Sequence, residues 1–433
     1  MLHNKIRYDF DQIALDAQLK TDAGVTLKPV LQQIRSAVDD TQYSTSYASV
    51  RLPFDAPMLQ AVEARVKDIG PIDHVVVIGI GGSSLGFKAV YDALQDQASM
   101  PSRSIIVLET VDTPSVVAAL KHIDYVLTQK LRVHVCVISK SGTTTETITL
   151  WRMVQPVLQE HAAHQWHIGV TIITDAGSVL EQYAHDHKIA VLHIPPLVGG
   201  RYSVLSSVGL FPLMLCGIDG DVVHAGARDA LTDATTLPLQ DTFPFKHACA
   251  LQAAYNNCYE VHDTFIFSPW CATLGLWYRQ LAAESLGKMS TVEDMIVDMI
   301  PTVSIGSTDL HSIGQLYLSG AQNFWTTFLI VHEHNVIKTN DDHALDRCVQ
   351  SLNNRSLNAI MSAIIQGTMA AYQERGVPFS VVTLPERSPY AIGYLLQSYM
   401  LAIIYAGELL GVNPFDQPDV ERYKSITRTL LDQ

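Results

Sequence analysis

The stretch HVVVIGIGGSSLG, residues 74–86, sets the pattern for the fold: a run of β-branched residues ends in glycines and serines, and a helical segment follows. Further Val/Ile-rich runs lie at Ser104–Leu108, Val133–Ile138, Ile168–Thr174 and Ala190–Ile194. The segments between these runs are long enough for helices. Because continuous apolar strands that alternate with helices are typical of a parallel sheet covered on both faces, we expect a doubly wound α/β domain over residues 54–230.

A second series of short apolar runs follows the first. These runs are Thr264–Phe267, Ile296–Ile300, Phe324–Val331 and Phe379–Leu384. They again alternate with helical segments, such as Leu274–Leu286, and predict a second doubly wound domain over residues 231–388. We expect a polar helical segment before the two domains, over residues 1–53, and a helical arm after them, over residues 389–433. The chain length of 433 residues agrees with this division at about 150 residues per domain.

The composition excludes several classes of protein. Hydrophobic residues make up 48% of the chain and charged residues only 17%, which excludes a disordered chain. The formal net charge is −14 and no basic run is present, which argues against binding to nucleic acid or to a membrane surface. An acidic balance by itself disfavours an anionic ligand, but binding is decided by the groups at the site rather than by the whole surface.

The six cysteines and the N-terminal residues indicate the compartment. No two cysteines form a C-x-x-C pair, and most lie among apolar residues, as expected of free thiols in a reducing environment. The first residues contain no apolar segment typical of a signal peptide. The apolar stretch 204–218 contains Pro212 and is shorter than the about 20 residues that cross a bilayer. We therefore expect a soluble cytoplasmic protein.

The first strand of the pattern ends in a glycine-rich loop, Gly79–Gly86. Glycines let backbone amides approach a ligand, and the following helix N-terminus favours an anion. A dinucleotide-binding G-x-G-x-x-G motif needs glycine where the chain has Ser84. Glu109 nevertheless lies where a ribose-binding acid belongs, so a dehydrogenase remains an alternative, as does a purely structural turn.

A second loop, Ser139–Thr147 (SKSGTTTET), contains six hydroxyl groups and Lys140 where a strand gives way to a helix. One hydroxyl is enough to cap a helix, so the others are in surplus. Hydroxyl donors together with free helix amides suit a phosphate monoester, whereas the motif for a nucleoside triphosphate is absent. Two such loops after neighbouring parallel strands predict one small phosphorylated ligand at the carboxyl edge of the sheet.

Several further residues are candidates for acid, base or electrostatic roles. Arg201 lies in the turn GGRYS, where a guanidinium could face developing negative charge. Glu284 and Lys288 are four residues apart on a predicted helix, a spacing that also fits a surface ion pair. His311 and Lys424 have structural alternatives as well, a buried histidine and a solvated lysine respectively.

A metal site is not expected. The histidines His161, His164 and His167 are spaced three residues apart, which spreads them around a helix. No acidic ligand accompanies them.

Taken together, these segments resemble the glucose-6-phosphate isomerase (phosphoglucose isomerase) family, in its shorter bacterial form built from two sugar-isomerase (SIS) domains. The resemblance runs from about Val75 to Lys424 and rests on motifs that occur in the order of the family. They are Gly79–Gly86, Ser139–Thr147, Gly199–Leu210 (GGRYSVLSSVGL), Gln280–Lys288 (QLAAESLGK), Gly306–Gln315 (GSTDLHSIGQ) and Asn413–Lys424 (NPFDQPDVERYK). Any one motif alone is a weak or moderate signal, and the resemblance rests on their occurring together and in the order of the family.

The resemblance implies a site and an activity. The implied substrate-binding positions are Gly82, Ser83, Ser139, Lys140, Ser141, Thr144, Gln280 and Gln417, and the implied catalytic ones are Arg201, Glu284, His311 and Lys424. The activity is the interconversion of glucose 6-phosphate and fructose 6-phosphate without metal or organic cofactor. It also implies a homodimer in which the histidine comes from the partner subunit. Leu286 departs from the small or polar residue that members of the family often carry.

The expected reaction moves a proton between two sugar carbons through an enediolate, with Glu284 as the base. Arg201 is expected to stabilise the enediolate, and His311 with Lys424 to open the hexose ring. Two alternatives remain at this point. The SIS domains could form a non-catalytic sugar-phosphate sensor, and the enzyme could act on another phosphosugar such as mannose 6-phosphate.

Overall fold

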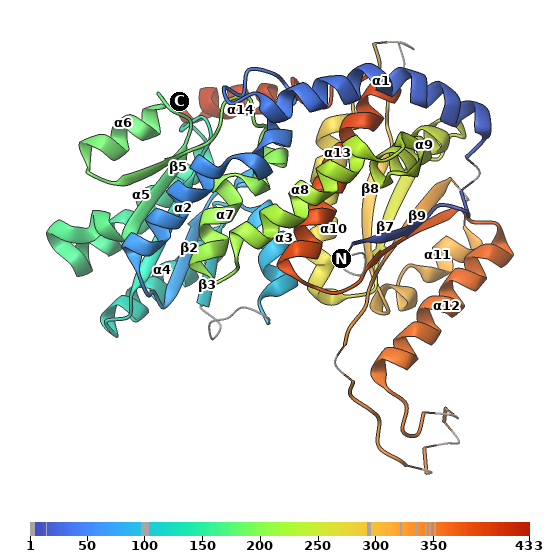
Figure 1. The fold of residues 1–433 in the computed structure, drawn as a ribbon. Helices are drawn as coiled ribbons and strands as arrows, with labels where there is room; N and C mark the ends of the chain where they lie inside the picture. The colour runs from blue at the N-terminus through green and yellow to red at the C-terminus, as the bar shows by residue number, and fades with distance from the viewer. Residues whose placement is uncertain are drawn as a thin grey trace.

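The computed structural model describes residues 5–433 apart from 14, 97–103, 292–295, 321–322, 335, 343, 346–347 and 350–351. The described residues form two five-stranded sheets with helices between and around them (Figure 1). The predicted architecture, two doubly wound α/β domains with helical segments at both ends, is confirmed.

The first sheet has the strand order β3-β2-β4-β5-β6, with all neighbours parallel. Its strands are β2 (His74–Ile78), β3 (Ser104–Leu108), β4 (Val133–Ile138), β5 (Val170–Thr174) and β6 (Ala190–His193). The surrounding helices are α2 (Ala56–Ile69), α3 (Leu85–Leu94), α4 (Thr113–Thr128), α5 (Thr145–Ala162), α6 (Val179–Asp186) and α7 (Ser207–Leu215). Each predicted strand of this domain is present, shortened at one end by up to two residues.

The second sheet has the order β1-β10-β9-β7-β8, and β1 runs antiparallel to β10. Its strands are β1 (Arg7–Asp9), β7 (Val261–Ile266), β8 (Ile300–Ile305), β9 (Phe324–Val331) and β10 (Phe379–Leu384). The N-terminal segment therefore contributes a strand, which the prediction of helices and turns there missed. Pairing with the sheet edge holds this three-residue strand, and no local pattern marks it.

The strand expected at Ile296–Ile300 was misplaced, because β8 begins at Ile300 and continues through Pro301. Ile296 instead forms an isolated bridge with Met289. A proline argues against a central strand, but β8 lies at the edge of its sheet, where a missing N–H group is tolerated.

The two sheets share a topology that brings equivalent helices together. The order β8-β7-β9-β10 in the second sheet corresponds to β3-β2-β4-β5 in the first. Helix α10 (Ala272–Leu286) follows β7 as α3 follows β2, and these two helices pack against each other. The domains therefore meet through the helices that leave the carboxyl ends of their first strands.

The core has three parts that follow the alternation of side chains along the strands. Val75 and Val77 face a central core shared with Trp325 and Leu329 of the second sheet. The opposite face of the first sheet packs on α4, α5 and α6. The opposite face of the second sheet packs its phenylalanines on α11 (Gly314–Ser319) and α12 (Leu357–Arg375). Helices thus cover both faces of both sheets.

Helix α13 (Pro389–Leu409) runs through the central core against α8 (Gly220–Thr236) and α9 (Phe243–Asn256) (Figure 1). A Cβ atom at Gly226 would lie 1.9 Å from the carbonyl oxygen of Tyr390, and one at Gly393 would lie 2.0 Å from that of Val223. The glycines therefore let α8 and α13 touch through their backbones. The domain boundary predicted at residue 230 falls inside α8.

Among the described residues, α13 is the one helix long and apolar enough to cross a membrane by length and composition. Inside this protein, however, 94% of its most apolar window is buried. Its hydrophobicity is accounted for by its place at the centre of the core.

Helices at the two ends of the chain complete the fold. Helix α1 (Ala17–Asp39) lies against α9 and α13, while α14 (Val420–Leu431) lies beside the first domain (Figure 1). None of the residues of α14 is buried. Helices α13 and α14 both lie within residues 389–433, where the sequence predicts a helical arm.

Four histidines are buried in the part of the chain that the structure describes, and all have lowered pKa values because burial disfavours their charged form. The pKa is about 3 for His134 and His247 and about 4 for His224, and it is well below the ordinary value for His262. Nε2 of His247 hydrogen bonds to the hydroxyl of Tyr278 at 2.8 Å. The same hydroxyl lies 3.2 Å from Nδ1 of His262. These imidazoles are neutral in the folded protein at neutral pH.

The free energy of unfolding should therefore fall as the pH drops below about 6.5, the pKa of an exposed histidine. In that range the unfolded chain binds protons that the folded protein excludes, so each buried histidine contributes a slope of about 1.4 kcal/mol per pH unit. Urea denaturation at about pH 7.5 and about pH 5 measures the slope. His247→Gln should reduce the pH dependence, while His164→Gln, at an exposed position, should not. Equal slopes for His247→Gln and the unaltered protein would contradict this explanation.

Candidate active site

A cavity of about 540 Å³ lies where the carboxyl edge of the first sheet meets α10 and the C-terminal segment. Its walls come from the two loops that the sequence singles out, from the turn at Arg201, and from α10 and α14. The predicted site residues that line it are Gly82, Ser83, Lys140, Ser141, Thr144, Arg201, Gln280, Glu284, Gln417 and Lys424. Ten of the twelve predicted positions therefore surround one cavity, although they are spread over most of the chain.

The glycine loop is shaped by a close approach between two backbones. A Cβ atom at Gly82 would lie 2.3 Å from the carbonyl group of Gly200, so only glycine fits there. Gly81 has φ of 58°, in the left-handed region that favours glycine. These contacts bring the turn that carries Arg201 against the loop after β2.

The hydroxyl loop leads into the N-terminus of α5. Ser139 is buried outside the cavity lining and hydrogen bonds to the hydroxyl of Thr144 at 2.9 Å. Ser141 makes a similar bond with Thr143 at 3.0 Å. Because the first N–H groups of a helix have no partner within it, the start of α5 offers donors beside these hydroxyls. Hydroxyls, helix amides and a positive helix end form a cradle suited to an anion.

Lys140 lines this cavity, but its ammonium group donates a hydrogen bond to the carbonyl oxygen of Val198 at 2.8 Å. Asp175, which also lines the cavity, has its pKa raised by burial, an effect that the charge of Lys140 partly offsets. Lys140 therefore ties the hydroxyl loop to the segment before Arg201.

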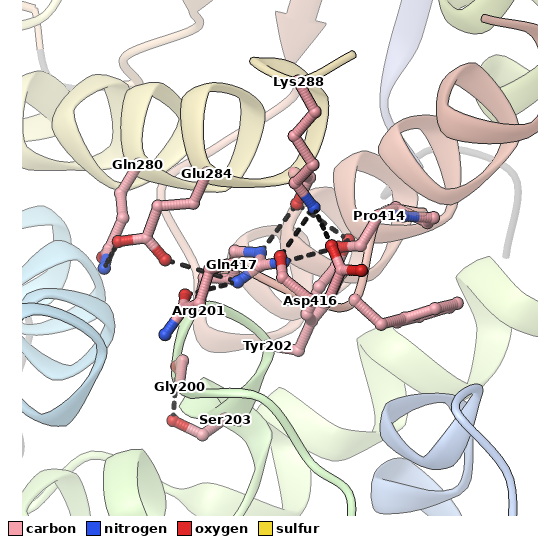
Figure 2. A network of polar contacts seen from close by, with 12 residues as sticks. Gly200, Arg201, Tyr202, Ser203, Gln280, Glu284, Lys288, Pro414, Asp416 and Gln417 are labelled. Atoms are coloured by element: carbon pink, nitrogen blue, oxygen red, sulfur yellow. Dashed lines mark hydrogen bonds and ion pairs between the residues drawn. The ribbon is translucent and has the colours of Figure 1, made fainter. Parts of the chain in front are cut away.

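Arg201 is 98% buried, and its guanidinium is fully engaged by the protein (Figure 2). Nε donates to Ser285 at 2.7 Å, and Nη1 donates to Glu284 at 3.4 Å and to Gln417 at 2.8 Å. Nη2 donates to the carbonyl oxygen of Pro414 at 2.7 Å and to that of Asp416 at 2.9 Å. A guanidinium has five N–H groups, so every donor has an acceptor.

Glu284 lies on α10 with its carboxylate at the cavity wall (Figure 2). Gln280, one turn earlier, donates to its Oε1 at 2.9 Å, while Arg201 reaches its Oε2 at 3.4 Å. The Glu284 side chain keeps 31% of its surface exposed. Two fixed donors thus orient a carboxylate that remains accessible from the cavity, the arrangement a general base requires.

Lys288 does not pair with Glu284, so the alternative of a surface ion pair between them is wrong. Its side chain is 12% exposed and bonds to Asp416 across the gap between α10 and the C-terminal loop. The two residues face different partners because α10 ends at Leu286, before Lys288.

Helix α14 covers one side of the cavity with residues spaced three or four apart. Lys424 lines the cavity and donates to Glu421 at 2.7 Å. Arg428, one turn further on, also lines the cavity, and motif reasoning missed it. The sequence did hold a signal for Arg428: it is four residues from Lys424 on a predicted helix, so both side chains lie on the same face of that helix.

Two residues considered from the sequence do not reach the cavity. His311 is exposed at the end of a short turn after β8, in the second domain, and does not line the cavity. Glu109 is held by Ser84 at 3.1 Å and by Lys88 at 2.7 Å, also outside the cavity lining. The position of Glu109 therefore does not support the dinucleotide alternative.

Comparisons with known proteins agree with this site. Residues 58–433 match the sequence model of the family described as phosphoglucose isomerase. A glucose-6-phosphate isomerase from Clostridium novyi is 33% identical over 83% of this chain and 80% of its own length. One from Streptococcus equi subsp. zooepidemicus is 33% identical over 87% of this chain and 83% of its own.

Solved structures show the same fold. A hypothetical protein from Thermus thermophilus has a TM-score of 0.87 and 29% identity, with 99% of this chain and 100% of that chain covered. A glucose-6-phosphate isomerase from Chlamydia trachomatis has a TM-score of 0.82 at 19% identity, with 100% and 89% covered. The family match spans most of the chain and includes every segment that lines the cavity. This chain is a member of the phosphoglucose isomerase family.

Proposed function

We propose that this protein interconverts glucose 6-phosphate and fructose 6-phosphate, with Glu284 as the base. The observation that carries the proposal is the placement of the oriented, accessible carboxylate of Glu284 in the same cavity as the hydroxyl loop. A phosphate cradle and a base in one cavity suit a phosphorylated sugar whose reactive carbons lie away from its phosphate.

The phosphate of the substrate binds at Ser141, Thr143, Thr144 and the start of α5. Ser139 supports this loop from below through its bond to Thr144. Lys424 and Arg428 of α14 also line the cavity, and we do not assign them to the phosphate. Binding at this end of the cavity anchors the sugar without taking part in the chemistry.

The proton transfer takes place at Glu284. Its carboxylate removes the proton from carbon 2 of the open-chain aldose and returns it to carbon 1 of the enediolate. The hydroxyl proton of the carbon 2 oxygen passes to the carbon 1 oxygen in the same interconversion, which gives the ketose with no net change in protons. Because one carboxylate serves both carbons, both must present the same face to it. Gln280 and Arg201 hold the carboxylate in the orientation for this transfer.

Arg201 contributes to this step by its fixed charge and by the groups it holds. Its positive charge beside Glu284 and Gln417 favours the negative enediolate, even though its N–H groups have protein acceptors. By accepting from Arg201 through Oε1, Gln417 leaves its amide N–H groups for the cavity. We assign those N–H groups to the sugar oxygens.

Ring opening is assigned to His311 of a second subunit together with Lys424. His311 of the same chain lies outside the cavity. A homodimer in which each chain supplies this histidine to the other completes the site. We also place the enzyme in the cytoplasm, in keeping with the six free thiols of the described residues.

Glu284→Gln should still bind glucose 6-phosphate while losing exchange of its carbon 2 proton with solvent, because an amide cannot accept that proton. Proton NMR in deuterated water measures the exchange. Glu160→Gln, at an exposed position on α5, is the matched control. Retained exchange at carbon 2 would remove Glu284 from the role of base.

Arg201→Lys should lower kcat by about a hundredfold with a smaller effect on KM, because an ammonium cannot satisfy five acceptors. Steady-state kinetics separate the two constants. Arg152→Lys, at an exposed position of α5, is the matched control. A rise in KM at unchanged kcat would instead make Arg201 a group that binds the ground state.

Co-expression of Glu284→Gln and His311→Ala chains should restore activity that neither variant has alone. Random pairing gives half heterodimers with one intact site of two, hence about a quarter of full activity. Two different affinity tags isolate the heterodimer for assay. Absence of recovered activity in the purified heterodimer would contradict a shared site.

A further inference from the structure

Lys288 is not among the residues that line the cavity, yet it is the most fully engaged lysine near the site. Its ammonium donates to the carbonyl oxygen of Asn413 at 2.5 Å, to that of Asp416 at 2.6 Å, and to Oδ1 of Asp416 at 2.7 Å. An ammonium has three N–H groups, so all of them have acceptors. Burial lowers the pKa of Lys288, and the hydrogen bond to Asp416 acts in the opposite direction.

The loop that Lys288 binds is held by two cations at once. Arg201 donates to the carbonyl oxygens of Pro414 and Asp416, so the carbonyl of Asp416 is shared between Arg201 and Lys288 (Figure 2). The loop also closes on itself, because Asn413 donates to Oδ2 of Asp416 at 2.9 Å. The carbonyl and carboxylate oxygens of this loop lie close together and repel one another. The positive charges of Arg201 and Lys288 offset this repulsion.

The loop carries two predicted site residues. Gln417 follows Asp416 directly and lines the cavity, and α14 with Lys424 begins three residues later. No residue of α14 is buried, so packing contributes little to its position. The position of α14 relative to the rest of the site therefore depends mainly on the hydrogen bonds at residues 413–416.

We propose that Lys288 is a positioning residue. Through its bonds to Asp416 it fixes the positions of Gln417 and α14 relative to Glu284. Glu284 lies in the last turn of α10, and Lys288 follows it by four residues, just beyond the end of the helix. Glu284 faces the cavity, and Lys288 binds the loop that leads to Gln417 and α14, which also line the cavity. Arg201 holds the same loop from the first domain, so the two cations join three separate segments.

This inference rests on the proposed isomerase activity, and it predicts a specific defect. Lys288→Met keeps most of the length of the side chain and removes the ammonium. We expect kcat with fructose 6-phosphate to fall at least tenfold, while the inhibition constant of inorganic phosphate changes less than threefold. The bonds of Lys288 go to Asn413 and Asp416 rather than to the phosphate loop at 139–147, so the affinity for phosphate should survive.

Two further variants separate positioning from general stability. Asp416→Asn and the double variant Lys288→Met/Asp416→Asn should each have about the same kcat as Lys288→Met, because the two side chains act as one unit. Lys288→Arg, which keeps the charge, should recover part of the kcat that Lys288→Met loses. Thermal melting establishes that each variant is folded at the assay temperature. Lys121→Met, at an exposed position on α4, is the matched control.

The outcomes are distinguishable. An inactive unaltered enzyme would refute the proposed function itself. With an active enzyme, the positioning role is overturned by any of three results: unchanged kcat in folded Lys288→Met, a multiplicative loss in the double variant, or a loss of phosphate affinity as large as that of kcat.

Discussion

The buried guanidinium of Arg201 joins parts of the chain that otherwise fold as separate elements. Its five N–H groups meet acceptors on α10 and on the C-terminal loop, and its own turn is pressed against the loop after β2 by the contact between Gly82 and Gly200. A charge this deeply buried is tolerated only when each donor is satisfied. The cavity therefore depends on the convergence of these segments around one cation.

This arrangement explains how an acidic protein can accept an anionic substrate. The net charge of −14 describes the whole surface and affects solubility and steering. At the cavity, Lys140, Arg201, Lys424 and Arg428 supply positive charge, and α5 adds the positive end of its helix dipole. Arg201 and Lys140 are held by backbone carbonyls before any ligand arrives, so little reorganisation is needed when negative charge develops.

The features that were predicted correctly from the sequence are those that a local residue pattern encodes. Continuous apolar runs located most strands, and the surplus of hydroxyls in Ser139–Thr147 indicated the anion cradle. Strand β1 escaped because only its pairing with β10, distant in sequence, defines it. Lys288 was given the wrong partner because the sequence shows its neighbour Glu284, whereas Asp416 is 128 residues away. Arg428 carries no motif, and its place at the cavity follows from the path of α14.

The proton-transfer chemistry is the central claim, and isomerisation by the unaltered enzyme in deuterated water tests it most directly. If Glu284 carries a proton through an enediolate, its carboxylic acid exchanges with solvent during turnover. Deuterium then enters carbon 2 of glucose 6-phosphate recovered from fructose 6-phosphate, as NMR or mass spectrometry can show. Complete isomerisation with no deuterium in the sugar would instead indicate direct hydride transfer between the two carbons and would contradict the account.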